Sequence, residues 1–222
     1  MDIRVIDLGF VDYMVGDAAQ REALREVKDG SAGSALILAE FIPVYTIGRT
    51  GSTGNLFVSK DFLEKKGIKV YNINRGGDIT VHSPGQLVVY PVIDLGRLRK
   101  DIAWYLRSLE QVVINVLSEY SIEGARRPGL TGVWVQDKKV SFIGIAVSKW
   151  VSYHGFSLNI NNDLSFFELI NPCGIKDCPV TSIAALTGRA IDSNELKSGL
   201  IRNFKKIFGG KTNADIKSGA LA

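Results

Sequence analysis

The sequence predicts an α/β fold of the α+β kind, a mainly antiparallel or mixed sheet flanked by helices. Two observations favour this class. Short apolar runs bounded by glycine, proline, asparagine or serine recur along the chain, as strands and turns require. Residues 102–120 instead repeat apolar side chains with the helical period over about five turns, which indicates one long core helix. Together they predict a sheet with helices packed on it.

The strands expected in the first half of the chain span residues 3–8, 35–39, 43–49, 68–73, 79–81 and 87–89, the last two joined by a turn at Ser83-Pro84-Gly85. Helix-forming residues at 17–27 end at Gly30. A shorter helix is expected at 60–66, with Ser59 as its N-cap.

In the second half, strands are expected at 131–136, 139–147 and 151–160, the first two forming a hairpin with its turn at Asp137-Lys138. A short helix at 163–169 and an amphipathic helix at 193–208 follow. We find no internal repeat, low-complexity segment or linker. Residues 1–209 are therefore expected to form a single domain, and residues 210–222 a flexible C-terminal tail.

Composition narrows the class of protein. The 222 residues are 45% hydrophobic and 23% charged, which is ordinary for a globular protein with its own core. No apolar run approaches the roughly 18 residues of a membrane span, and the first residues do not resemble a signal peptide, so a cytoplasmic location is expected. The net charge of +4 favours an acidic partner, although a basic, solvated C-terminal end explains it equally well.

Four side chains are candidates for chemistry, and each has a structural alternative. Cys173 lies between proline and glycine, where a loop can present a nucleophilic thiol, but it can also be a buried filler residue. His82 and His154 can act as acid or base, or simply anchor loops. Lys139 begins a strand at a hairpin tip, where a solvated lysine is usual. Cys178, in a less exposed setting, is expected to be structural.

Some common sites are missing from the sequence. It holds no H-x-x-H or C-x-x-C pair, no P-loop and no G-x-G-x-x-G after a strand. The stretch 75–90 is more informative, because Gly76 and Gly77 let the backbone approach a ligand closely while Arg75 and His82 supply polar groups. Arg49, beside glycines at the end of a strand, can hold an anionic or carbonyl group, or lie in a plain turn.

Several segments between residues 40 and 190, in order, closely resemble the lipoyl(octanoyl) transferase family. Residues 75–87, RGGDITVHSPGQL, are similar to its R-G-G-x-x-T-x-H-G-P-G-Q-L. Residues 132–135 and 139–144 resemble G-V-W-V and K-[IV]-x-x-[IL]-G, and residues 154–159 and 171–174 resemble H-G-x-A-L-N and N-P-C-G. Residues 43–49 with 55–56 resemble P-V-Y-T-x-G-R…N-L. Ser83 and Ser157 depart from the usual glycine and alanine, which puts the preferred acyl length in doubt.

The resemblance implies an acyltransferase that moves octanoyl, or lipoyl, from acyl carrier protein to a specific lysine of lipoyl domains, the first step of endogenous protein lipoylation. Cys173 would carry the acyl group as a thioester, and Lys139 would be its partner. The expected acceptors are lipoyl domains of 2-oxoacid dehydrogenase complexes and the glycine cleavage H protein. No metal, nucleotide or other cofactor is expected, and neither nucleic acid nor a membrane is an expected partner.

The resemblance also implies the fold of lipoate and biotin protein ligase catalytic domains, and it assigns further site residues. Substrate binding is expected of Arg75, Gly76, Gly77, Asp78, Ile79, Thr80, Val81, His82, Phe142, Ile143, Gly144, Gly155, Phe156 and Ser157. Supporting roles are expected of Arg49, Gly85, Gln86, His154 and Asn159.

Three other interpretations remain open at this point. An ATP-dependent lipoate or biotin ligase on the same fold would need no cysteine nucleophile. A lipoyl amidotransferase would take its acyl group from another lipoylated protein. A non-catalytic binding module, for instance for nucleic acid, would fit the pI near 9.0, although aromatic residues are not interleaved with the basic ones.

Overall fold

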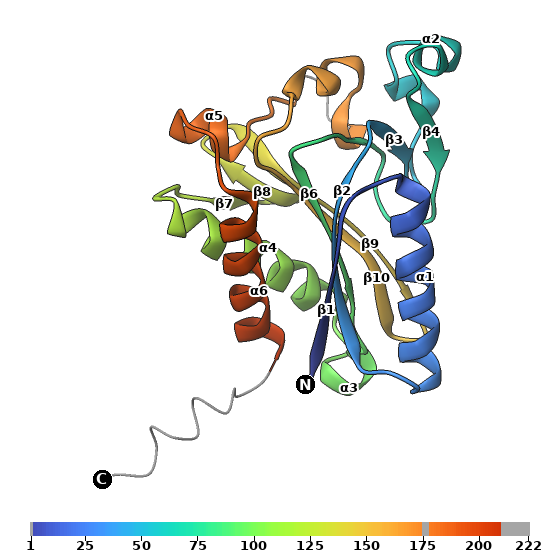
Figure 1. Ribbon diagram of the computed structural model, residues 1–222, viewed down its shortest axis with the longest axis vertical. Coiled ribbons are helices and arrows are strands. Elements are labelled where there is room, and N and C mark those ends of the chain that lie inside the picture. Colours follow the sequence, from blue (N-terminus) through green and yellow to red (C-terminus); the bar gives the residue numbers. More distant parts are fainter. Residues whose placement is uncertain (1, 175–177, 210–222) are drawn as a thin grey trace.

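The computed structural model describes residues 2–174 and 178–209, so the tail expected at 210–222 lies outside the described residues. A seven-stranded sheet forms the centre of the molecule, in the order β1-β2-β6-β10-β9-β8-β7 (Figure 1). Only β1 and β2 pair in parallel, and all other neighbours in this sheet are antiparallel. The strands are β1 (Ile3–Val11), β2 (Ser34–Phe41), β6 (Gln86–Val92), β7 (Ala125–Arg127), β8 (Leu130–Val135), β9 (Lys138–Ser148) and β10 (Val151–Asn159).

A second, three-stranded sheet has the order β4-β3-β5, from β3 (Val44–Ile47), β4 (Lys69–Asn72) and β5 (Ile79–His82). The strands expected on either side of Ser83-Pro84-Gly85 both form, but they do not pair with each other. β5 pairs with β3 in the small sheet, while β6 pairs with β2 and β10 in the large sheet. The turn therefore carries the chain from one sheet to the other.

Helices cover both faces of the large sheet (Figure 1). Helix α1 (Tyr13–Asp29) packs on one face, where it shares a core with Val88 and Tyr90 of β6. Helices α4 (Ile102–Glu119) and α6 (Ser193–Phe208) pack on the other face, against Leu87 and Val89 of the same strand. Successive side chains of a strand point to opposite faces, so a strand covered on both sides is largely apolar, as β6 is after Gln86.

Helix boundaries follow from their caps. Asp12 accepts a hydrogen bond from the backbone of Met14, so α1 begins four residues before the expected start at 17. Its end at Gly30, in the left-handed conformation, and the Ser59 cap of α2 (Lys60–Lys65) are as predicted. The helix expected at 163–169 is the 3₁₀ helix η2 (Leu164–Leu169).

The β8–β9 hairpin forms as predicted, with its two-residue turn at Gln136-Asp137 rather than at Asp137-Lys138. Elements that the sequence patterns did not indicate are all short: β7, α3 (Leu95–Leu98), α5 (Ile183–Thr187), η1 (Thr53–Asn55) and η3 (Pro172–Gly174). No helix in the described part of the chain is long and apolar enough to cross a membrane. β1 begins and α6 ends at the lower side of Figure 1, whereas the orange segment with η2 and η3 lies at its upper side.

Candidate active site

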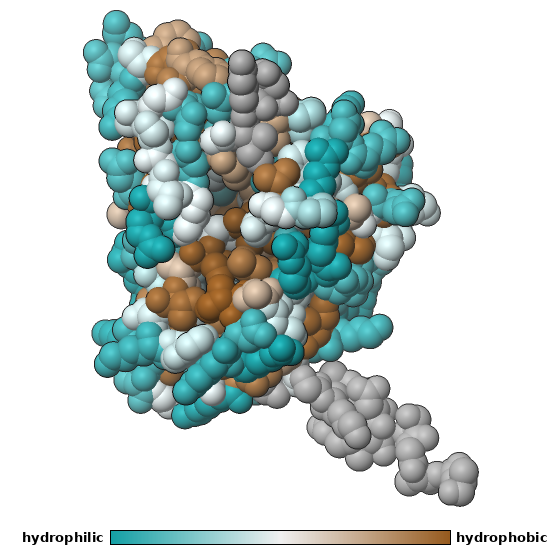
Figure 2. All heavy atoms as spheres, turned by 180° about the vertical axis from the view of Figure 1, so that it is seen from behind, coloured by the Kyte–Doolittle hydropathy of each residue, from teal (hydrophilic) through white to brown (hydrophobic). Residues whose placement is uncertain are grey.

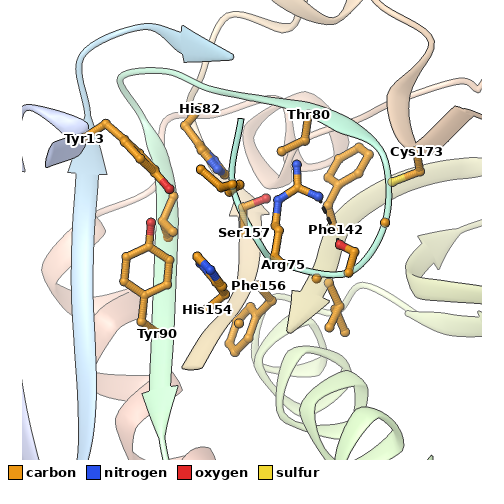
Figure 3. Close-up of a pocket in the computed structure, with 17 residues that line it drawn as sticks. Tyr13, Arg75, Thr80, His82, Tyr90, Phe142, His154, Phe156, Ser157 and Cys173 are labelled. Atoms are coloured by element: carbon orange, nitrogen blue, oxygen red, sulfur yellow. Dashed lines mark hydrogen bonds between the residues drawn. The ribbon is translucent and has the colours of Figure 1, made fainter. Parts of the chain in front are cut away.

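A cavity lies between the two sheets, with about 470 Å³ of space including its open mouth. Strands β5, β6, β9 and β10 line it, together with the glycine-rich loop that precedes β5. Hydrophobic side chains form much of the wall, among them Val88, Phe142, Ile143 and Phe156. Figure 3 shows Cys173 at one end, and Tyr13, Tyr90 and His154 at the opposite end.

Cys173 and Lys139 meet beside this cavity. The Lys139 ammonium donates a hydrogen bond to the Cys173 thiol, with 3.6 Å between Nζ and Sγ. Lys139 is only 1% exposed, so it is not the solvated turn lysine that its hairpin position suggests. No residue in the described ranges forms an ion pair with it, and its ammonium instead lies over the rings of Trp134 and Phe142, 5.3 and 4.9 Å from their centroids.

The backbone around Lys139 fixes the direction of this long side chain. Its amide donates to the carbonyl of Pro179, and its own carbonyl accepts from Thr181. Gly132 of β8 leaves the space that the side chain occupies, because a Cβ at residue 132 would lie 2.6 Å from Lys139 Cε. The amide of Gly132 is in turn bound by the buried carboxylate of Glu110. The ammonium is therefore delivered to Cys173 by a rigid support.

Cys173 adopts a left-handed backbone conformation, with φ 57° and ψ 23°. Residues other than glycine rarely take this conformation, and it costs on the order of 1–2 kcal/mol unless the surroundings enforce it. Here the amide of Gly174 donates to Asn171, and the amide of Asn171 donates to the carbonyl of Asn55. The segment around η1 thus holds the turn that presents the thiol.

Asp78 strengthens the same attachment. One carboxylate oxygen accepts from the amides of Ser52 and Ile79, and the other accepts from the Asn55 side chain at 2.5 Å. Gly174 packs directly against this carboxylate, since a Cβ there would lie 2.9 Å from Asp78 Oδ2. Asp78 is not among the residues that line the cavity, and the substrate-binding role expected of it stays a prediction. Its place indicates a role in holding the Cys173 turn.

Arg75 places a positive charge against the cavity. Its guanidinium is buried and donates to the carbonyl and hydroxyl of Thr46 at 2.8 and 3.0 Å, and to the carbonyl of Gly76 at 3.1 Å. All three acceptors are neutral. Burial lowers the pKa of Arg75 below its ordinary value, but a guanidinium stays protonated at neutral pH. The cavity therefore favours negative charge, such as a thiolate or the oxyanion of an acyl-transfer step.

His82 and His154 are neutral at physiological pH. Burial lowers the pKa of each imidazole to about 4, and the positive charge of Arg75 contributes to both shifts. His82 Nδ1 lies 2.7 Å from Gln86 Oε1, and Gln86 in turn donates to Asn159 at 2.8 Å. Gln86 and Asn159 support His82 from behind and do not line the cavity.

Most of the expected acyl-site residues are brought together. The cavity is lined by Arg75, Gly76, Gly77, Thr80, His82, Phe142, Ile143, Gly144, His154, Gly155, Phe156, Ser157 and Cys173. The binding roles expected of them stay predictions. Gly155 is required by packing, because a Cβ there would lie 2.2 Å from the carbonyl oxygen of Val89. The hydroxyl of Ser157 faces the cavity without a hydrogen-bond partner in the described structure.

Other expected residues lie elsewhere. Ile79 and Val81 point into the core of the small sheet, which follows from the alternation of β5. Gly85 packs against the backbone of residues 161 and 162. Arg49 binds the carbonyl of Arg75 through its backbone amide, while its side chain lines a separate outer groove.

The cavity also contains residues that the sequence did not point to: Tyr13, Ile73, Val88 and Tyr90. Val88 and Tyr90 share one face of β6, and their alternation was a usable signal. Tyr13 comes from a helix far from every motif, and nothing local marks it. Within residues 2–174 and 178–209, no three His, Cys, Asp or Glu side chains gather as metal ligands would.

Comparisons with known proteins first define the class. The fold is that of lipoate and biotin protein ligase catalytic domains. A bipartite lipoate protein ligase from Thermoplasma acidophilum, solved with its E2 lipoyl domain, superposes with TM-score 0.73 at 18% identity, covering 94% of this chain and 84% of that one. Biotin protein ligase from Aquifex aeolicus, in complex with biotin and ATP, gives TM-score 0.58 at 17% identity, covering 93% and 70%.

The sequence comparisons then narrow this class. Residues 12–205 match the lipoyl protein ligase A/B catalytic domain. An octanoyltransferase from Solibacter usitatus is 45% identical over 201 residues, which are 90% of each chain. The chain therefore belongs to the lipoyl protein ligase A/B family, within its lipoyl(octanoyl) transferase branch, as its sequence motifs predicted. It is an acyltransferase of protein lipoylation.

Proposed function

We propose that this acyltransferase moves an octanoyl group from acyl carrier protein to a specific lysine of a lipoyl domain through a thioester on Cys173. One observation carries the proposal: Lys139 Nζ lies 3.6 Å from Cys173 Sγ at the end of a largely apolar cavity. An ammonium beside a thiol favours the thiolate, which is the nucleophilic form. Burying an acyl chain against these walls contributes about 0.8 kcal/mol per CH₂.

The pair can serve both halves of the transfer. In the first, the Cys173 thiolate attacks the thioester carbonyl, the bond to the carrier sulfur breaks, and the Lys139 ammonium protonates the departing thiolate. In the second, the neutral amine of the acceptor lysine attacks the new thioester. The amine's proton passes to the Lys139 amine and the Cys173 thiolate is expelled. The site returns to its starting charge state, and an amide bond has formed.

This chemistry needs no metal, nucleotide or other cofactor, and we propose that none takes part. The proposed acceptors are lipoyl domains of 2-oxoacid dehydrogenase complexes and the glycine cleavage H protein, and the proposed location is the cytoplasm. The Thermoplasma acidophilum ligase solved with its lipoyl domain supports an acceptor of this kind for the fold.

The decisive experiment is intact-protein mass spectrometry after incubation with octanoyl-acyl carrier protein. We expect the wild type to gain one octanoyl group that hydroxylamine removes and that a lipoyl domain discharges. Cys173→Ser should gain none, whereas the matched variant Cys178→Ser should load as the wild type does. Equal transfer by Cys173→Ser, or transfer that depends on ATP, would instead identify a ligase that works through an acyl-adenylate.

A further inference from the structure

A row of hydrogen-bonded side chains holds His154, which lines the cavity. Figure 3 shows His154 beside Tyr90, on the side of the cavity away from Cys173. Its Nε2 lies 2.8 Å from Asn74 Oδ1, and Asn74 donates to the hydroxyl of Tyr153 at 2.8 Å. On its other side, His154 Nδ1 lies 3.2 Å from Gln20 Nε2. The imidazole is therefore held from both sides.

The direction of each bond can be assigned. The backbone amide of His154 donates to Gln20 Oε1 at 2.8 Å, which leaves Gln20 Nε2 to donate to His154 Nδ1 and to Asp17. A neutral imidazole that accepts at Nδ1 carries its proton on Nε2, and this proton is donated to Asn74. The low pKa of His154 agrees with one neutral tautomer at pH 7. The hydrogen bonds of this row thus fit a single assignment of donors and acceptors.

The backbone of His154 is unusual for a residue inside a strand. Its φ is 54°, in the left-handed region that favours glycine, although β10 continues on both sides. Non-glycine residues in this region are often kept at functional sites, where the surrounding structure over-determines them. Here the hydrogen bonds that His154 makes with Gln20 and Asn74 hold the residue at this position.

An open groove lies on the outer side of this row. Asn74 and Tyr153 line it, together with the hydrophobic residues Ile102, Ile145 and Val147. The groove and the cavity share no lining residue, and the bond between His154 and Asn74 joins the wall of one to the wall of the other. Asn74 is exposed, so its hydrogen bond latches the imidazole, that is, holds it in place, from the solvent side.

We propose that His154, latched by Asn74, is the end wall that sets the longest acyl chain the cavity accepts. This inference rests on the proposed function and adds a specificity-determining residue to it. A chain that ends before the wall leaves every bond in the row intact. A longer chain must displace the imidazole and break its hydrogen bonds. Burying one more methylene contributes no more free energy than one hydrogen bond does, so the longer chain is disfavoured.

The test is His154→Gly, because glycine suits the left-handed backbone while removing the wall. Loading of Cys173 from octanoyl, decanoyl and dodecanoyl carrier thioesters is followed by intact mass. We expect the dodecanoyl-to-decanoyl rate ratio to rise about tenfold, the factor that two further buried methylenes supply. The dodecanoyl-to-octanoyl ratio spans four methylenes and should rise by more. Asn74→Ala should shift the ratios in the same direction by less. Asn72→Ala, an exposed asparagine in β4, should leave them unchanged.

A folded His154→Gly protein that loads octanoyl and keeps the wild-type ratios would overturn the end wall. If His154→Gly does not fold, Asn74→Ala decides, and unchanged ratios again reject the proposal. Calorimetric binding of free octanoate and dodecanoate to the Cys173→Ser variants separates this question from the thioester mechanism. Tighter dodecanoate binding when residue 154 is glycine supports the wall even if no acyl-enzyme forms in the wild type. Unchanged dodecanoate binding rejects it.

Discussion

The buried lysine beside Cys173 is the most specific feature at the scale of single residues. Because the Lys139 ammonium donates to the Cys173 thiol at 3.6 Å, its removal should leave the attacking sulfur without a charged partner. We expect Lys139→Met to slow alkylation of Cys173 by iodoacetamide at pH 7 by about tenfold or more. The exposed neighbour offers a control, since Lys138→Met should react as the wild type does. Equal rates for the two variants would show that Lys139 does not activate the thiol.

The two buried histidines predict how stability depends on pH. Each has a folded pKa of about 4, below the ordinary value of 6.5, so the unfolded chain binds protons first as the pH falls. The stability that each neutral histidine contributes is present above about pH 6.5 and is lost as the pH falls towards 4. The loss is on the order of 3 kcal/mol per histidine.

His82→Gln should isolate one of these contributions. We expect the variant to be less stable at pH 7 but to lose less free energy of unfolding between pH 7 and 4.5, because residue 82 then no longer titrates. Urea unfolding midpoints at several pH values give the measurement. Parallel curves for wild type and variant would show that His82 is not held neutral by burial.

At this scale the sequence pointed to the candidate residues better than to the side chains around them. Its motifs singled out Cys173, Lys139 and Arg75, which the structure brings to one place, and the roles expected of them stay predictions. Tyr13 precedes the helix expected at 17–27 and Gln20 lies within it. Both were missed because they meet the site only through packing with distant strands. Contacts between residues more than a hundred positions apart leave no local signal.

At the scale of whole elements, the contacts of Asp78 attach η1 to η3. Asp78 receives hydrogen bonds from Ser52, Asn55 and Ile79, and hydrogen bonds to a charged group contribute about 1.5–3 kcal/mol each. We expect Asp78→Ala to lower Tm by several degrees and to slow acylation of Cys173 by about tenfold, because the strained turn is no longer held.

A surface carboxylate provides the comparison for this variant. Glu64→Ala in α2 changes an exposed residue and should leave both Tm and acylation rate near wild type. Thermal unfolding and single-turnover loading measure the two effects separately. If Cys173 in Asp78→Ala is acylated at the wild-type rate, the attachment contributes to the stability of the fold but not to acylation.

Element types were readable from periodicity, whereas strand partners outside the β8–β9 hairpin were not. The apolar runs at 79–81 and 87–89 correctly predicted strands, but nothing in either run says that the chain changes sheets between them. Pairing depends on which other strands offer matching edges and faces, and that is a property of the assembled fold. The same limit explains the short elements that were missed, which are shaped by their neighbours rather than by their own pattern.

The molecule as a whole places its cavity where the two sheets meet and carries a net charge of +4. Such a charge favours encounter with an acidic partner, and we expect the proposed carrier-protein donor to respond to it. We expect kcat/KM for carrier-bound octanoyl to fall as salt rises from about 0.01 to about 1 M, over which the Debye length shrinks from about 30 to about 3 Å. Octanoyl-N-acetylcysteamine, an uncharged donor, should show little change. The same salt response with both donors would argue against electrostatic steering.

The places where β1 begins and α6 ends bear on where a second domain can be fused to this protein. β1 begins and α6 ends on the side of the molecule away from η3, the turn that bears Cys173 (Figure 1). Figure 2 shows the molecule from behind, with hydrophobic residues gathered in a patch near the middle of that face. A donor or acceptor domain fused before β1 through a flexible linker can therefore raise its own effective concentration at Cys173 without the junction obstructing the site.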